Sequence, residues 1–187
     1  MILHIRGCFT EKTMAGLGKE YRMKFDLNID IYRPLTQVFA FVTTPENDFH
    51  WQYGTLMSAK ISGGEMGVGT LIRVIGHLMG RRVESTYEVT EFDANKSYGF
   101  KSLSGLMDLC TLYTFEIIKG STRISHSTQI SLGEPLKSNP TTVEKSVKKE
   151  YRENLALLKD VLEASRVEVM SLEGTLPVSR RRKSDFS

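Results

Sequence analysis

The chain has 187 residues, of which 40% are hydrophobic and 25% are charged. This length and composition are typical of one globular domain with short extensions, and they provide enough apolar side chains for a sizeable core. The formal net charge is only +3 at pH 7, and residues 171–187 supply most of it. A nucleic-acid-binding surface needs basic residues spread over one face of a fold, so this charge pattern argues against a specific nucleic-acid partner.

Membrane and secretion signals are weak in this sequence. No apolar run reaches the roughly 20 residues that a transmembrane helix needs, and the N-terminal apolar stretch is too short for a signal peptide. The chain contains two cysteines, Cys8 and Cys110, and one such pair does not make a disulfide framework. We therefore expect reduced thiols and a cytoplasmic location.

The two ends of the chain differ in pattern from its centre. Residues 1–24 have no regular hydrophobic period, and their glycines interrupt any helix, so we expect a loosely ordered leader. Residues 171–187 contain the basic run Arg180–Lys183, which predicts a basic disordered tail that could contact an anionic membrane weakly. The folded domain is therefore expected over residues 25–170.

Within this domain the pattern predicts one strand, two short helices and six further strands. Hydrophobic residues alternate from Phe25 to Ile31, which is typical of a half-buried strand. Pro34 suits the first turn of a short helix, and Pro45 opens a second helical turn that ends near Trp51. Further strands separated by turn residues are expected near residues 54–61, 68–78, 82–92, 97–103, 107–118 and 122–132. The short connections predict antiparallel pairing.

A long amphipathic helix follows the last strand. Asn139 or Thr141 can cap it, and Pro140 fits its first turn. Its apolar stripe comprises Val143, Val147, Tyr151, Leu155, Leu158 and Leu162. Because this stripe must be buried, we expect the helix to lie across the concave face of the sheet. The predicted fold is of the α+β class: seven antiparallel strands wrapped around a long C-terminal helix.

Five segments carry a resemblance to a known family. They are Ile31–Phe39, Trp51, Gly67–Thr70, Tyr87–Phe92 and Gly120–Ile124. In their order and spacing, the chain resembles the START-like, or SRPBCC, helix-grip superfamily, most closely its polyketide cyclase/dehydrase branch. The resemblance covers about three quarters of the chain. It implies an apolar cavity between sheet and helix that binds lipids, quinones, polyketides or similar molecules.

The resemblance carries no catalytic motif onto this chain, and a fold alone does not define a reaction. Our first hypothesis is the binding or transport of a hydrophobic or amphipathic small molecule. The alternative is an enzyme of the polyketide cyclase or aromatase type that uses an inward histidine or tyrosine. A third hypothesis is a protein-interaction or co-chaperone-like domain. The oligomeric state is open.

The alternation of side chains along each strand predicts which residues reach the cavity. We expect an apolar wall with a few hydroxyl groups and one imidazole, as is usual in small-molecule pockets. The expected ligand-binding residues are Trp51, Arg73, Tyr87, Tyr98, Phe100, Thr111, Tyr113, Phe115, His126, Tyr151 and Leu155.

Three of these residues allow more than one interpretation. His126, assisted by Tyr113 or Tyr87, could transfer a proton, but a core histidine is favoured because no carboxylate is spaced to orient the ring. Arg73 could bind a ligand carboxylate, although a solvent-facing arginine is favoured. Trp51, which we expect beside Asp48 and His50 at the cavity mouth, could gate a ligand or anchor the second helical turn.

Metal and cofactor sites are not expected. The four histidines and two cysteines lack the spacing of metal ligands. The glycine-rich run Gly63–Gly69 lacks the lysine of a phosphate-binding loop and leads into a strand, so it predicts a hairpin.

Overall fold

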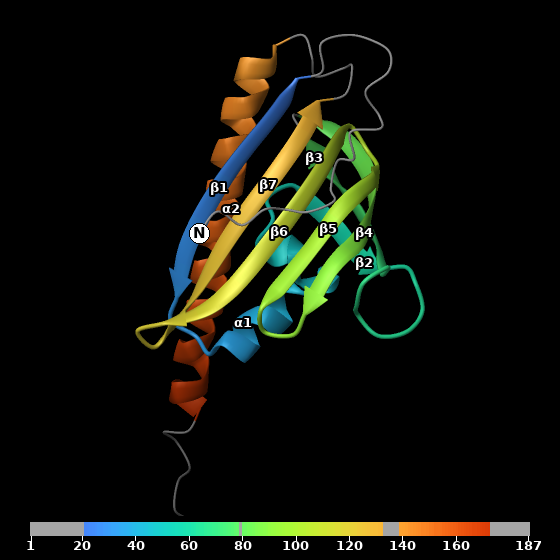
Figure 1. Ribbon diagram of the computed structural model, residues 1–187. Helices are drawn as coiled ribbons and strands as arrows, with labels where there is room; N and C mark the ends of the chain where they lie inside the picture. The colour runs from blue at the N-terminus through green and yellow to red at the C-terminus, as the bar shows by residue number, and fades with distance from the viewer. Residues whose placement is uncertain (1–20, 79, 133–138, 173–187) are drawn as a thin grey trace, which may run out of the picture.

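The computed structural model describes residues 21–78, 80–132 and 139–172, with side chains described up to residue 164. Seven strands form one antiparallel sheet in the order β1-β7-β6-β5-β4-β3-β2. The strands are β1 (Arg22–Ile31), β2 (Thr55–Lys60), β3 (Leu71–Leu78), β4 (Arg81–Asp93), β5 (Ser97–Ser104), β6 (Met107–Ile118) and β7 (Ser121–Leu132). Figure 1 shows the curved sheet with the long helix α2 (Pro140–Leu172) running along β1 and β7.

The two edge strands are neighbours in sequence but lie on opposite sides of the sheet. β1 pairs with β7, whereas β2 pairs only with β3. The connection between them contains the helix α1 (Leu35–Val42) and the 3₁₀ helix η2 (Pro45–His50). Phe39 of α1 packs its ring 5.1 Å from that of Phe115 in β6. The connection therefore crosses the inner face of the sheet and covers one end of it.

The helix α2 is held in place at both ends of its described side chains. The backbone N–H of Thr142 donates to the Asn139 side chain, so Asn139 supplies the cap. Further along, the Arg33 guanidinium donates to the carbonyl oxygens of Leu162 and Glu163 at 2.7 and 2.9 Å. The expected stripe is buried at Val143, Val147, Leu155, Leu158 and Leu162. The predicted helix-grip fold is confirmed.

Element boundaries differ slightly from those predicted. β1 begins at Arg22, so the last residues of the predicted leader belong to the sheet, because they pair with β7. The helix α2 extends to Leu172. Residues 1–20 and 173–187 lie outside the described residues, and these ranges contain most of the predicted leader and of the predicted tail.

The expectation of a reduced thiol is wrong for Cys110, which is disulfide-bonded. Cys8 lies outside the described residues. Disulfides are rare in cytosolic proteins, so this bond does not support the cytoplasmic location inferred from the cysteine count.

Candidate ligand cavity

The inner face of the sheet lines a cavity with two adjoining chambers that share seven lining residues. The outer chamber, of about 140 Å³, lies between the middle of α2 and strands β3, β4 and β6. The inner chamber, of about 70 Å³, extends toward the buried side chains of Val42 and Ile72. Both chambers are lined by Trp51, Gln52, Val74, Tyr87, Leu109, Tyr113 and Tyr151. A cavity of roughly 150 Å³ can bind a molecule the size of benzene, so this one fits a single ring or a short chain.

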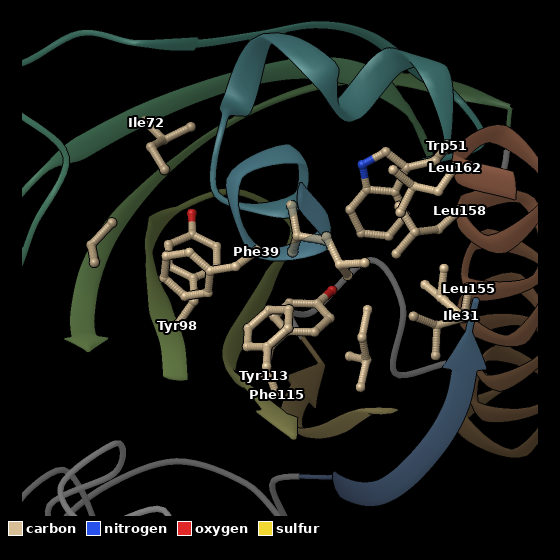
Figure 2. Packing of buried hydrophobic residues seen from close by; sticks show 14 residues of the cluster. Ile31, Phe39, Trp51, Ile72, Tyr98, Tyr113, Phe115, Leu155, Leu158 and Leu162 are labelled. Carbon is tan, nitrogen blue, oxygen red and sulfur yellow. The ribbon is translucent and has the colours of Figure 1, made fainter. Parts of the chain in front are cut away.

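The turn after η2 positions the residues that cover the inner chamber. The backbone N–H groups of Trp51 and Gln52 donate to the carbonyl oxygen of Asp48 at 3.1 and 2.7 Å. This tight turn places Asp48 and Trp51 on the same side. Figure 2 shows the Trp51 indole beside Leu158 and Leu162, with its nitrogen on the edge of the ring away from α2. Trp51 is only 2% exposed and packs in the core with Leu158 and Leu162, and it also lines both chambers.

The rim of the outer chamber depends on a close approach of two backbones. Gly54 has φ of +82°, a conformation that favours glycine, and a Cβ on Gly76 would lie 2.7 Å from the Gly54 carbonyl oxygen. The preceding residue, Tyr53, donates its backbone N–H to the side-chain oxygen of Asn154 in α2 at 2.8 Å. The rim is therefore joined directly to the helix.

A cluster of aromatic rings forms the sheet side of the inner chamber. The ring centroids of Tyr87 and Tyr98 each lie 5.5 Å from that of Phe100, and Tyr98 stacks on Tyr113 at 6.4 Å. Burial raises the pKa of Tyr98 and of Tyr113 above the usual value of a phenol. Both hydroxyl groups are therefore neutral at physiological pH, and they can donate hydrogen bonds to a bound molecule.

One carboxyl group faces the inner chamber. Ser58 donates its hydroxyl to Oδ2 of Asp48 at 2.7 Å. Burial raises the pKa of the Asp48 carboxyl to about 7, while hydrogen bonds from Ser58 and Gln52 oppose this shift and the charge of Glu46 adds to it. Asp48 is thus partly ionised near neutral pH, which distinguishes it from an ordinary surface aspartate.

His126 lies behind the cavity wall. Its ring is 1% exposed and packs 4.8 Å from Tyr113 and 5.0 Å from Tyr151, both of which line the chambers. Neither ring nitrogen has a hydrogen-bond partner among the described residues. Burial lowers the pKa of His126 to about 4, so the imidazole is neutral at physiological pH. His126 therefore cannot reach a ligand in either chamber in this conformation.

The structure brings together most of the predicted ligand-binding residues. Those that line at least one chamber are Trp51, Tyr87, Tyr98, Phe100, Tyr113, Tyr151 and Leu155. Thr111 and Phe115 are buried deeper: the Thr111 hydroxyl lies 2.9 Å from that of Thr128, and Phe115 packs on Phe39. Tyr151 directs its hydroxyl to Thr111 and Thr128, so it offers the cavity mainly its ring.

Arg73 is placed outside the cavity. Ile72 and Val74 line the chambers, so the period of two along β3 turns Arg73 to the outer face of the sheet. There it forms an exposed ion pair with Glu84 at 2.6 Å. The suggestion that Arg73 binds a ligand carboxylate is therefore corrected, and the solvent-facing interpretation holds.

Several cavity residues were missed by the sequence analysis. Asp48 was expected near Trp51 at the mouth but was not assigned a role in binding. Its spacing of three residues from Trp51 in a 3₁₀ turn was a usable signal, because side chains at this spacing overlie each other. Glu150 and Asn154 of α2 also line the outer chamber, at the edge of the predicted stripe. His50, in contrast, is exposed and packs on Phe49.

Within residues 21–78, 80–132 and 139–172, no group of three or more His, Cys, Asp or Glu side chains is arranged to hold a metal ion. No helix in this part of the chain is long and apolar enough to cross a membrane.

A seven-stranded antiparallel sheet that holds a long helix over an apolar cavity defines a helix-grip ligand-cavity protein. The family model described as "Polyketide cyclase / dehydrase and lipid transport" matches residues 22–163. The chain belongs to this family, within the START-like superfamily that the sequence resembles.

Solved structures share the fold at low sequence identity. The crystal structure of TTHA0849 from Thermus thermophilus matches with a TM-score of 0.67 and 18% identity, over 76% of this chain and 99% of that one. A START superfamily protein from Mycobacterium smegmatis gives 0.64 and 14%, over 75% and 97%. The crystal structure of Ara h 8.0201 gives 0.61 and 13%, over 77% and 99%. No curated protein matches the sequence.

Proposed function

We propose that the protein binds, and so carries, a hydrophobic or amphipathic small molecule in the cavity between the sheet and α2. The observation that supports this most directly is the pair of adjoining chambers whose shared lining is mostly aromatic and aliphatic. Such a concave apolar site with a few directed polar groups is typical of small-molecule binding. The family description, which includes lipid transport, agrees with this proposal.

The cavity volume limits the size of what can be enclosed. The two chambers together fit a ring or a short chain. A longer molecule would extend past the rim at Tyr53 and Gly54, or would require α2 to move outward. We therefore propose that the chambers recognise one end of the ligand.

The alternative of a cyclase that uses an inward histidine has less support. His126 is separated from the chambers by Tyr113 and Tyr151, and it has no carboxylate to orient its ring. Tyr113 lines both chambers, but its pKa is raised mainly by burial, so its hydroxyl stays protonated at physiological pH and is not available as a general base. A collapsed cavity would favour the third hypothesis, a protein-interaction domain. Both chambers beside Trp51 contain open space, so the cavity is not collapsed.

Native mass spectrometry of the freshly purified full chain tests the proposal. A co-purifying small molecule, identified after solvent extraction, is the expected result. Val74 lines both chambers, so Val74→Phe should fill part of the cavity and reduce the occupied fraction. Ile75 lies on the opposite face of β3, and Ile75→Phe is the matched control. Equal occupancy in the two variants would contradict binding in this cavity.

A further inference from the structure

The charge of the cavity lining is one-sided. Asp48 lines the inner chamber and Glu150 lines the outer one, and no lysine or arginine occurs among the described residues that line them. His77, the one histidine of this lining, is exposed on the same face of β3 as Arg73. The described interior therefore offers a negative charge without a positive partner.

The groups around Asp48 do not neutralise its charge. Its hydrogen bonds come from the hydroxyl of Ser58 and the side chain of Gln52, both of which are neutral. Burying a carboxylate without a cation is unfavourable, and burial is the main reason that the pKa of Asp48 is raised to about 7. A cation that enters the chamber would recover part of the hydration energy that this carboxylate has lost.

Aromatic rings surround the same space. Burial is the largest cause of the raised pKa of Tyr87, of Tyr98 and of Tyr113, and the charge of Asp48 raises each of them further. The carboxylate is therefore an electrostatic neighbour of all three phenols. Aromatic faces attract cations, and several rings around one site add to that attraction. The chamber combines a carboxylate with such rings.

The indole N–H of Trp51 is a second, independent sign of a ligand. The side chain is 2% exposed and lines both chambers, yet its nitrogen has no acceptor among the described residues. A buried donor without a partner costs about 1–3 kcal/mol in general. A protonated amine has no lone pair to accept from this N–H, so a ligand that satisfies it must carry an oxygen atom in addition to the amine. The cavity thus provides an acceptor at Asp48 and a donor at Trp51.

We propose that the molecule bound in this cavity is an amphipathic amine, whose protonated amine pairs with the carboxylate of Asp48. This inference rests on the proposed function and specifies its ligand class. The ammonium group occupies the inner chamber among the tyrosine rings, and the apolar part lies in the outer chamber beneath α2. Fatty acids are disfavoured, because their carboxylate would face both Asp48 and Glu150.

A matched series of probes tests the ligand class. Octylamine, octanol and octanoate share one apolar chain and differ in charge. They are titrated into the full chain at pH 8, where Asp48 is ionised, with the emission of Trp51, the one tryptophan of the chain, as the readout. Octylamine is expected to bind about tenfold more tightly than octanol, and octanoate most weakly. The net charge of +3 acts against this order at long range, so the preference would arise locally.

Variants locate the preference in the cavity. Asp48→Asn keeps the shape and an acceptor for Ser58 but removes the charge, so octylamine should lose about tenfold in affinity while octanol changes little. Glu150→Gln should weaken octylamine less, because Glu150 lies in the outer chamber. Asp93→Asn removes an exposed carboxylate at the end of β4 and is the control for net charge.

The outcomes separate the two proposals. Equal binding of octylamine and octanol, or equal octylamine binding by wild type and Asp48→Asn, would overturn the amine proposal while leaving small-molecule binding supported. If none of the three probes changed Trp51 emission or gave a complex in native mass spectrometry, both proposals would be overturned.

Discussion

The two halves of the inner sheet face bury their side chains in different ways. Over β1 and β7, the first part of α2 packs tightly, with Val143 and Val147 against Phe25 and Ile130, and we call this region the filled half. Over β3, β4, β5 and β6, the same face carries the two chambers beneath the η2 turn, and we call this region the hollow half. The filled half contains the buried His126 and the hollow half contains the half-buried Asp48, and the two groups are held differently.

In the filled half, His126 is enclosed by Phe25, Tyr113 and Tyr151 and has no hydrogen-bond partner among the described residues. In the hollow half, Asp48 is hydrogen-bonded to Ser58 and faces a space that a ligand can enter. The difference arises because α2 lies along one side of the sheet only (Figure 1). An ionisable group is therefore structural in one half and available for ligand recognition in the other.

The largest expected effect contrasts one leucine from each half. Leu132 is 2% exposed in the filled half, so Leu132→Ala should lower the free energy of unfolding by about 2–5 kcal/mol. Leu109 lines both chambers, and Leu109→Ala enlarges an existing cavity, so its cost should fall near the lower end of that range. Urea unfolding of both variants measures the difference. Equal costs would show that the hollow half packs as tightly as the filled half.

The next effect concerns His126 and pH. Its pKa is lowered by burial from 6.5 to about 4, so between these values the unfolded chain binds a proton that the folded chain does not. The free energy of unfolding should therefore decrease by up to roughly 3 kcal/mol as the pH falls from 6.5 toward 4. His126→Leu should remove this part of the pH dependence, as followed by urea unfolding at several pH values. An unchanged pH dependence in His126→Leu would contradict this assignment.

Asp48 should show the opposite dependence. Its pKa is raised by burial from 3.8 to about 7, so the folded chain keeps a proton that the unfolded chain releases, and stability is lost as the pH rises through this window. Asp48→Asn should therefore be more stable than wild type at pH 8, by about 1–2 kcal/mol after allowance for partial exposure. The gap should close toward pH 4. A less stable Asp48→Asn at pH 8 would mean that the carboxylate supports the fold instead of a ligand.

The smallest effect is expected at Arg73, on the outer face behind the hollow half. Its ion pair with Glu84 is exposed, so Arg73→Gln should change the free energy of unfolding by less than about 1 kcal/mol. Titration of octylamine or octanoate against Trp51 emission should give the wild-type affinity. A clear loss of octanoate binding would show that Arg73 reaches the ligand after all.

Much of the candidate site followed from strand alternation. Tyr87, Tyr98 and Tyr113 were expected to face inward, and each lines a chamber. Strand alternation predicts the face on which a side chain lies, but not its distance from the open space. Thr111 and Phe115 were therefore expected at the ligand, whereas they lie in the packed core. Their depth depends on Thr128 and Phe39, which come from distant parts of the chain.

Asp48 was harder to interpret from sequence. Its position in a polar 3₁₀ turn beside exposed His50 is typical of a solvent-facing loop. What makes it unusual is the hydrogen bond from Ser58 and the three tyrosines that line the same chamber, and these four residues belong to four different strands. No local sequence pattern predicts that these residues from different strands lie around Asp48.

By itself, the sequence determined the element order, the antiparallel pairing and the buried stripe of α2, because these depend on periodicity and turn residues that act over a few positions. Only the tertiary structure decided that α2 lies along β1 and β7, that His126 is sealed behind two tyrosines, and that Asp48 faces a cavity. These features depend on how segments far apart in the chain fill or leave space between them, and packing of that kind is a property of the whole fold.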